Sequence, residues 1–401
     1  METEILIVGA GPSGAAAAVK LRQLGIRDVL LVDRDRFPRN KTCGSGLSPA
    51  ALHAAEALGI GPEVRKRANP VLTVRFVTPA GEVLQVPANS AAVILLRKEF
   101  DALLVERARA LGVRFRGGWR AMEAIEEGGR VVGVRGLEGE EIRARWTLFA
   151  DGAHSLFSTD DRERRHIDTL MGWWEGPAFE PGRLDMVFDA ELSPLYGWLF
   201  PETATRVNIG ICIDAQDEYG RKTPRDLRAV FRRFLERHYG EELRTARQIG
   251  GLKGHPIVHT TWIANVSRPG ALVIGEAARL THNGTGEGIS QAMESGIFAA
   301  EALARVVRGE DSEEAAWDGY LRALRRRFTV GFAAGHLLRE LVADGMLDRL
   351  ARTYNSESFQ RAIHWIVGAA LTGSTSQEAP AGYGQPRHDG AESKGDESQM
   401  A

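Results

Sequence analysis

The chain has 401 residues, with 51 Lys and Arg against 53 Asp and Glu and a formal charge of −2. The 43% hydrophobic and 26% charged shares are those of a globular protein, neither disordered nor fibrous. Near neutrality excludes a dominant polybasic surface, so no nucleic-acid partner is expected. The N-terminus has no signal-peptide pattern, and no apolar run approaches the roughly 18 residues of a membrane-spanning helix. Two cysteines are too few for a disulfide framework, so a cytoplasmic protein is expected.

The first part of the chain predicts a β-α-β unit followed by mixed elements. An apolar run at 4–8 leads through a glycine turn into a helix at 15–24, and a second strand covers 29–32. Residues 50–70 are expected to be helical, and 72–86 to form a hairpin around Pro79-Ala80-Gly81. The elements that follow are an apolar segment, a helix and a β-meander, at 91–96, 100–112 and 130–148.

The second part begins with a change of pattern. From about 165 to 265 the sequence alternates as antiparallel strands do, which predicts an inserted β-rich domain. A buried strand at 271–274 and a helix that ends near 307 come next, and the chain is then expected to be helical to about 371. Residues 373–401 are rich in Gly, Ser, Gln, Glu and Pro, which predicts a disordered tail.

A glycine-rich turn, Gly9-Ala10-Gly11-Pro12-Ser13-Gly14, lies between the first strand and its helix. Such glycines permit a tight turn and let the backbone approach a pyrophosphate, which the helix N-terminus attracts. Asp33 ends the second strand about 20 residues on, where an acid binds the ribose hydroxyls. The strand, helix and acid together indicate a dinucleotide site instead of a merely structural turn. Its candidate contacts are Gly9, Gly11, Ser13, Gly14, Asp33 and Arg34.

Three further segments resemble the FAD-dependent reductases and monooxygenases built on the para-hydroxybenzoate hydroxylase plan. They are Arg97 before Phe100-Asp101, the strand end Asp151-Gly152, and Gly275-Glu276 followed by Gly284–Gly288. The resemblance implies FAD as the cofactor, with the arginine and the two strand-end motifs clamping its pyrophosphate and ribityl chain. The residues that it adds to the cofactor site are Arg97, Asp151, Gly275, Glu276, Gly286, Gly288 and Ile289.

Two more segments are similar to the geranylgeranyl reductase family in particular. Phe37–Gly46 resembles that family's Pro-x-x-Lys-x-Cys-Gly-x-Gly loop, and Tyr196–Pro201 matches its Tyr-x-Trp-x-Phe-Pro motif. The similarity, which extends over about residues 4–310, implies that Cys43 and Gly44 lie beside the flavin. No second glycine fingerprint is present, so electrons are expected from docked NAD(P)H or from a carrier such as ferredoxin.

The implied fold is α/β: a Rossmann-type FAD-binding domain with an inserted antiparallel β-sheet substrate domain and a helical C-terminal region. The first part of the FAD-binding domain is expected at 1–165, with the 70–90 hairpin contributing to the substrate domain. The later parts are the substrate domain, the returning FAD-binding segment, the helical region and the tail, at 166–265, 266–310, 311–372 and 373–401.

Tyr196, Trp198 and Phe200 share one face if their segment is a strand, because strand side chains alternate. Such an aromatic wall suits an isoprenoid chain, and aromatic faces stabilise developing positive charge by about 1–2 kcal/mol in a dry site. An aromatic stripe is otherwise ordinary strand core. The match to the family motif favours the pocket, and it makes these three residues the candidate substrate contacts.

The candidate catalytic residues are Cys43, Tyr196, Trp198 and His282. Cys43 is expected to touch the isoalloxazine, the alternative being a small buried hydrophobe, whereas Cys212 is expected to be packing. The proton donor is open between Tyr196, His282 and a water molecule. No metal site is expected, because His255 and His259 lack a third ligand.

The sequence departs from the family pattern at three places. Glu276 replaces the usual aspartate, His282-Asn283 stands where Asn-Pro is usual, and Asp151-Gly152 is not followed by the usual arginine. The expected function is the reduction of C=C bonds in a polyprenyl substrate by hydride transfer from reduced FAD. The alternatives are a flavin-dependent monooxygenase or halogenase, and a non-catalytic flavoprotein partner. Peripheral membrane contact is a further expectation, from an arginine cluster at 322–327 beside Phe328, Phe332, Leu337 and Leu338. A solvated helix face is its alternative.

Overall fold

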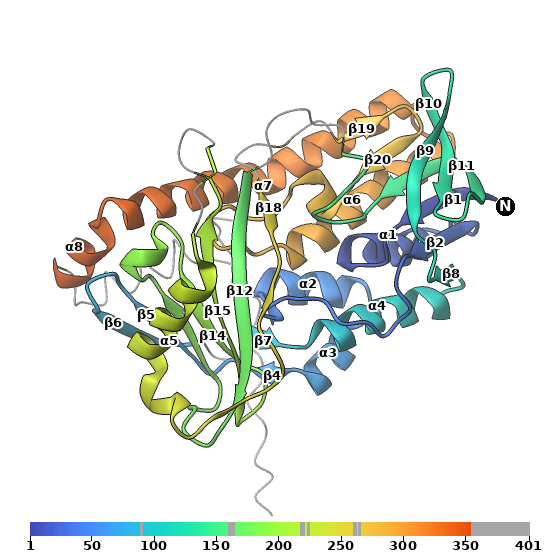
Figure 1. Ribbon diagram of the computed structural model, residues 1–401. Helices are drawn as coiled ribbons and strands as arrows, with labels where there is room; N and C mark the ends of the chain where they lie inside the picture. Colours follow the sequence, from blue (N-terminus) through green and yellow to red (C-terminus); the bar gives the residue numbers. More distant parts are fainter. Residues whose placement is uncertain are drawn as a thin grey trace, which may run out of the picture.

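The computed structural model describes residues 1–88, 91–158, 165–216, 221–222, 225–259, 263 and 266–353. The end of the expected helical region and the expected tail at 373–401 lie outside these residues. Two sheets dominate the fold, with helices packed around them, and a long C-terminal helix extends from one sheet to the other (Figure 1).

The first sheet has eight strands around a parallel centre. The parallel strands, in spatial order, are β8 (Arg114–Gly117), β2 (Val29–Asp33), β1 (Glu2–Val8), β11 (Glu141–Phe149) and β20 (Ala271–Val273). The antiparallel strands are β9 (Ala121–Glu127), β10 (Arg130–Gly136) and β19 (Ser267–Arg268). All of β2 and most of β1 are buried, as parallel strands covered on both faces are. The predicted β-α-β unit and the hairpin part of the meander are both present.

Besides the long C-terminal helix, five helices of the described residues pack on or beside this sheet (Figure 1). They are α1 (Pro12–Gln23), α2 (Pro49–Ala57), α3 (Gly61–Arg67), α4 (Arg97–Ala110) and α6 (Ile289–Val307). Helix α2 begins where the Ser48 hydroxyl accepts the Ala51 N–H at 3.2 Å, an N-cap followed by a proline. Gly296 lets α6 contact α1, because a Cβ there would overlap the Ser13 carbonyl oxygen. The predicted helices at 15–24, 50–70, 100–112 and 288–307 are therefore confirmed within a few residues.

The second sheet has nine strands. Its main path runs β16 (Arg247–Gln248), β12 (Arg165–Glu175), β15 (Arg206–Asp214), β14 (Gly197–Pro201), β13 (Arg183–Val187), β5 (Thr73–Val77) and β6 (Val83–Pro87). The short strands β17 (Lys253–Gly254) and β18 (Ile257–His259) also pair with β12. Every pair is antiparallel except β5 with β13. The predicted hairpin is thus present, and it extends this sheet. A small third sheet joins β3 (Gly46–Leu47), β7 (Val93–Ile94) and β4 (Asn69–Pro70).

Helix α5 (Leu227–Leu243) corrects the sequence prediction, which assigned only strand alternation to this stretch. Its buried residues Val230, Phe231 and Phe234 follow the three-and-four spacing of a helix face. The Asp226 carboxylate caps it by accepting the N–H groups of Arg228 and Ala229 at 3.1 and 3.0 Å. The capping aspartate and the helical spacing were the sequence signals for this helix. The strand-like alternation of the surrounding segment obscured them.

The two faces of the second sheet carry separate cores. One face packs on α5 through residues such as Leu170, Trp174 and Leu199. The opposite face gathers Met171, Trp198 and other apolar side chains of alternate positions along the same strands. This second face is the one that the C-terminal helices cover, so we call it the covered face.

Helix α7 (Glu313–Ala343) packs against both the first and the second sheet (Figure 1). Trp317, Tyr320 and Phe328 are buried in the core of the first sheet. Leu338 and Val342, near its end, pack on the covered face together with Leu347 of α8 (Met346–Thr353). Within the described part of the chain, no helix is both long and apolar enough to cross a membrane.

Candidate functional site

The glycine-rich turn is shaped by two close approaches and leaves one opening. Gly9 has a φ of +103°, and a Cβ there would lie 2.7 Å from the Ala150 carbonyl carbon. A Cβ at Gly14 would overlap the Gly9 carbonyl oxygen. At Gly11 the nearest atom to an added Cβ is Nη2 of Arg39, at 3.7 Å. Gly11 therefore has free space beside it at the N-terminus of α1, which is the room that a diphosphate needs.

Asp33 lies at the end of β2 beside this turn. Its Oδ2 accepts the Ala10 N–H at 2.7 Å and its Oδ1 accepts the Asp35 N–H at 2.8 Å. Each carboxylate oxygen retains a lone pair for a ribose hydroxyl. Burial raises the pKa of Asp33 above its usual range. Arg34 is exposed, and its Nε lies 3.9 Å from Asp35 Oδ2. Arg34 is therefore farther from the glycine-rich turn than Asp33 is.

Arg97, the first residue of α4, forms a buried ion pair. Its Nε and Nη2 donate to the two carboxylate oxygens of Asp101 at 2.7 and 2.8 Å. Burial alone would lower the pKa of Arg97, but the fully buried Asp101 carboxylate outweighs that effect and raises it. Arg39 adds a second cation, with its Nη2 3.1 Å from Asp101 Oδ2. Arg39 was not among the predicted site residues, because nothing in the sequence joins it to Asp101.

Of the two other strand ends, one adjoins the glycine-rich turn and the other contacts α1 and α6. The Asp151 carboxylate accepts the Leu156 N–H at 3.0 Å after β11. Gly275 follows β20 with a φ of +67°, and a Cβ there would lie 2.6 Å from Ser13 Oγ. The Gly275 N–H donates to Ser295 Oγ at 2.9 Å. Ser13 and Gly275, both predicted site residues, are therefore neighbours.

Glu276 is half-buried next to the predicted cofactor site. Its Oε1 accepts the Val258 N–H at 3.3 Å, so the longer side chain reaches the backbone of β18. Burial raises the pKa of Glu276, opposed by the positive charge of Lys41. Burial likewise lowers the pKa of Lys41 to about 8. The departure from aspartate thus has a local partner in the second sheet.

The loop between η2 (Gly275–Ala278) and α6 carries Gly286, with a φ of +66°, and Gly288, which precedes the first helical residue Ile289. Glu287 between the two glycines accepts the Ser48 and Ser290 hydroxyls at 3.1 and 2.8 Å. This half-buried acid was not among the predicted residues, although its position before the helix was the available signal. It joins the loop to the start of α2.

His282 of the same loop is 1% exposed, and both of its ring nitrogens have partners. Nε2 lies 2.8 Å from the Gly331 carbonyl oxygen of α7, and Nδ1 accepts the Thr285 N–H at 3.1 Å. Burial lowers the pKa of His282 to about 4. The neutral ring therefore holds the loop against α7.

Tyr196, Trp198 and Phe200 form a continuous row on the covered face, as the alternation predicted. Successive ring centroids are 6.5 and 6.1 Å apart. Tyr196 and Trp198 are 7% and 6% exposed, and Phe200 is half-buried. The Tyr196 hydroxyl donates to the Thr285 carbonyl oxygen, which ties the row to the loop before α6.

The Trp198 indole is fixed by β15. Its Nε1 donates to Asn208 Oδ1 at 2.7 Å, and Asn208 Nδ2 donates to the Gly172 carbonyl at 3.1 Å. Gly210 is the cross-strand partner of Trp198, and a Cβ there would lie 2.6 Å from the indole Cε2. Neither residue was predicted. For Asn208 the available signal was an asparagine on an otherwise apolar strand face. The role of Gly210 follows from the cross-strand register, which the sequence alone does not supply.

The Cys43–Gly46 loop packs against the aromatic row. A Cβ at Gly44 would lie 2.7 Å from Phe200 Cδ2 and 3.3 Å from Trp198 Nε1. Cys43 is half-buried, its Sγ accepts the Ser45 N–H at 3.3 Å, and it lies within hydrogen-bonding reach of Arg97. The structure thus brings Cys43 and Gly44 to both Arg97 and the row, whereas His282 faces α7.

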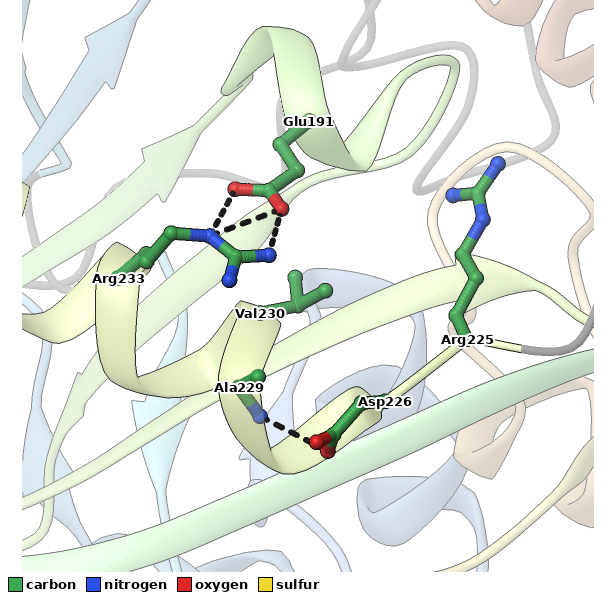
Figure 2. Close-up of a pocket in the computed structure, with 6 residues that line it drawn as sticks. All are labelled: Glu191, Arg225, Asp226, Ala229, Val230 and Arg233. Atoms are coloured by element: carbon green, nitrogen blue, oxygen red, sulfur yellow. Dashed lines mark hydrogen bonds and ion pairs between the residues drawn. The ribbon is translucent and has the colours of Figure 1, made fainter.

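A hollow on the opposite side of the second sheet does not belong to this site (Figure 2). It lies between η1 (Ala190–Leu192) and the start of α5, where Arg233 Nε contacts the Glu191 carboxylate at 3.1 and 3.2 Å. Val230 at its floor packs in the core under α5, away from the covered face. We therefore assign no role in the reaction to this hollow.

Comparisons with known proteins agree on the cofactor. The model of a family described as an FAD binding domain matches residues 2–327. A menaquinone reductase of Mycobacterium tuberculosis is 30% identical over 75% of this chain and 76% of its own length. A digeranylgeranylglycerophospholipid reductase of Methanopyrus kandleri is 28% identical over 90% of this chain and 93% of its own length.

Two solved structures share the fold. A geranylgeranyl bacteriochlorophyll reductase-like protein from Thermoplasma acidophilum has a TM-score of 0.77 and 23% identity, covering 92% of this chain and 98% of its own. A flavin-dependent brominase has a TM-score of 0.74 and 21% identity, covering 93% of this chain and 94% of its own. At these identities the likeness establishes the fold alone. FAD fits the residues present, since Gly11 leaves room at a helix N-terminus and Asp33 ends the adjoining strand.

Proposed function

Because the chain belongs to the geranylgeranyl reductase family of FAD-dependent oxidoreductases, we propose that it reduces carbon–carbon double bonds of a polyprenyl substrate. The names of its relatives support this, because geranylgeranyl lipids and menaquinone both carry isoprenoid chains. A flavin-dependent monooxygenase or halogenase, and a non-catalytic flavoprotein partner, are the competing functions that the experiment below must separate.

The observation that carries the proposal is the contact between the aromatic row and the Cys43–Gly46 loop. Gly44 allows Phe200 and Trp198 to approach a loop that also adjoins Arg97. A flat apolar chain on the row would therefore lie next to the cofactor side of the molecule. Tyr196 and Trp198 are almost fully buried, so bulk solvent is kept away from the row, although a single bound water molecule could still reach its edge.

Bound FAD, once reduced, supplies a hydride to one alkene carbon, and a proton must reach the other. Positive charge that develops on the more substituted carbon faces the rings of Trp198 and Phe200. Cation–π attraction in a dry site is worth about 1–2 kcal/mol. Asn208 holds the indole in place through Nε1, so the ring face stays available to substrate.

Of the candidate proton donors, two are already engaged in buried hydrogen bonds. The Tyr196 hydroxyl donates to Thr285, and burial raises its pKa well above the usual value. His282 is neutral and bound on both nitrogens. We therefore propose a water molecule as the proton donor, because donation by water does not require a buried hydrogen bond of the protein to break. Electrons come in this proposal from docked NAD(P)H or from a carrier such as ferredoxin.

The test is anaerobic reduction of the FAD-loaded protein with dithionite, followed by mass spectrometry after reaction with geranylgeranyl lipids, prenylated quinones and prenyl diphosphates. Products are expected to gain two hydrogens for each saturated bond. When the same reaction is repeated under air, oxygen consumption with incorporation of oxygen or halide would instead support the monooxygenase or halogenase. Flavin that stays reduced with every substrate and with oxygen would support a non-catalytic partner.

A matched pair of variants links this reaction to the covered face. Trp198 and Trp174 are each 6% exposed but lie on opposite faces of the second sheet. Trp198→Leu is expected to slow substrate saturation in folded protein by about 5- to 30-fold, the value of the lost cation–π attraction. Trp174→Leu is expected to lower stability and leave turnover per folded molecule intact. Equal turnover in both variants would contradict the assignment of the row to substrate.

We also propose that α7 contacts a membrane surface, by a smaller face than the sequence indicated. Phe328, Phe332 and Leu338 are buried, so only Leu337 and Val330 remain as large exposed apolar groups, at 55% and 52%. The exposed basic groups beside them are Arg322, Arg325 and Arg326, while Arg327 pairs with Glu294 at 2.8 Å. Flotation with anionic liposomes at low salt is the expected result, and no flotation at any salt concentration would refute it.

A further inference from the structure

Arg39 is held over the glycine-rich turn by three contacts. Its Nη2 is 3.1 Å from Asp101 Oδ2, its Nε is 3.8 Å from Asp35 Oδ2, and its guanidinium lies 4.9 Å from the centre of the Phe37 ring. The side chain is 12% exposed. These contacts fix the guanidinium plane and leave one edge of it unengaged.

That edge is Nη1, which is buried and has no hydrogen-bond partner. A buried donor without a partner is costly, by about 1–3 kcal/mol and more when it is charged. Such a group in a folded protein needs an explanation, and a bound ion or ligand that accepts its hydrogen bond is one. Nη1 of Arg39 therefore needs a hydrogen-bond acceptor, and no described residue provides one.

The charge of the cluster identifies the kind of acceptor. Arg39 and Arg97 carry two positive charges, and the Asp101 carboxylate between them carries one negative charge. Arg97 is already engaged, because its Nε and Nη2 both donate to Asp101. These three side chains therefore carry one net positive charge. The exposed Asp35 carboxylate, 3.8 Å from Arg39 Nε, offsets it only in part, and the free donor belongs to Arg39. An anion is the matching ligand.

The open space at Gly11 locates that anion. The Arg39 guanidinium is the nearest group to the side of Gly11 that a Cβ would occupy, and Gly11 is the N-cap of α1. No side chain caps this helix end, so its first N–H groups point into the same space. We propose that Arg39 Nη1 binds the diphosphate of FAD directly, and that Arg97 is a positioning residue that acts through Asp101.

This assignment rests on FAD binding and not on the reduction of a polyprenyl chain, so a binding experiment tests it separately. Apoprotein of wild type, Arg39→Gln and Arg39→Lys is titrated with FAD and with ADP, which carries the diphosphate without the flavin. Adenosine, which lacks the phosphates, is measured by competition. The matched control is Arg36→Gln, an exposed arginine three residues away.

Arg39→Gln is expected to raise the Kd of FAD and of ADP by about 10- to 100-fold, the value of a hydrogen bond to a charged group. Arg39→Lys keeps the charge without the planar fork and should fall in between. Adenosine affinity should not change, and Arg36→Gln should bind all three ligands as wild type does. The ³¹P NMR signals of bound FAD should shift in both Arg39 variants.

Asp101 keeps both hydrogen bonds from Arg97 in these variants, so the apoproteins are expected to fold, which circular dichroism checks. Wild-type Kd values for FAD and ADP in Arg39→Gln would overturn the proposal. An equal loss of adenosine binding would also overturn it, because the defect would then lie in the turn itself. If Arg39→Gln does not fold, unshifted ³¹P signals in Arg39→Lys would be the refuting result.

Discussion

Because Gly210 lies opposite Trp198, adding one methyl group at residue 210 tests the position of the indole. In Gly210→Ala the new Cβ would lie 2.6 Å from Cε2 and from Cη2 of Trp198, far inside van der Waals contact. Both atoms belong to a rigid bicyclic ring, so the indole must move as a whole. The expected result is a displaced Trp198 with a broken bond to Asn208.

The magnitude follows from two costs and one gain. Overpacking a filled core costs about 1–3 kcal/mol. Leaving the buried Asn208 Oδ1 without its donor costs about 1–3 kcal/mol more. Replacing a strand glycine by alanine returns about 0.5–1 kcal/mol of backbone entropy. Gly210→Ala should therefore lower the free energy of unfolding by about 1–5 kcal/mol.

Urea denaturation followed by tryptophan fluorescence measures this loss, and the emission of the folded state reports the moved indole. The matched control is Gly240→Ala in α5, where a Cβ would meet nothing within 4 Å and where alanine should stabilise the helix by up to about 1 kcal/mol. In the Trp198→Phe background the smaller ring should relieve the clash, with a coupling energy of about 0.5–3 kcal/mol between the two changes. Wild-type stability and emission in Gly210→Ala would refute the packing described for Trp198.

Three other predictions concern hydrogen bonds and charge. Tyr196→Phe and Tyr320→Phe each remove a buried hydroxyl that donates to a backbone carbonyl, so each should cost about 1–3 kcal/mol in urea unfolding. Only Tyr196→Phe should slow single-turnover oxidation of the reduced flavin by substrate, and equal rates would contradict the link to Thr285. Asp101→Asn leaves two buried arginines uncompensated and should destabilise the apoprotein by about 3–5 kcal/mol, less when FAD is bound, whereas exposed Asp35→Asn should have little effect. The pKa of His282 is lowered to about 4, against about 6.5 when unfolded, so its contribution to stability is full above pH 6.5. That contribution is lost as the pH falls toward 4, by roughly 3 kcal/mol, because the unfolded state binds the proton first. His282→Gln should flatten the fall in unfolding free energy between pH 6.5 and 4, and an unchanged slope would argue against a buried neutral ring.

Local patterns predicted much of this molecule. The turn at Gly9–Gly14 was predictable because the strand, turn and helix that define it are adjacent in the chain. The row from Tyr196 to Phe200 was predictable because strand alternation needs no knowledge of the partner strand. Both signals are contained within a few residues.

The residues that were missed take their meaning from distant parts of the chain. Arg39 matters because Asp101 of another element holds it, and Gly210 because the register of β14 and β15 sets it opposite Trp198. His282 was predicted as a possible acid, but its surroundings on α7 are set by packing. Helix α5 was missed because helical spacing was not separated from strand alternation in a stretch rich in both.

The order of strands in the first sheet has a consequence for biosynthesis. Strands β1, β2, β8 and β11 are complete once Phe149 has been made, but β20, which pairs in parallel with β11 at Thr147 and Ala271, emerges only after the second sheet. The edge of β11 that later pairs with β20 therefore remains unpaired in the nascent chain until β20 has been synthesised. Closure of that edge requires a long loop to form, which slows folding. We expect the nascent chain to be most prone to aggregation, and most dependent on chaperones, while the second sheet is being synthesised.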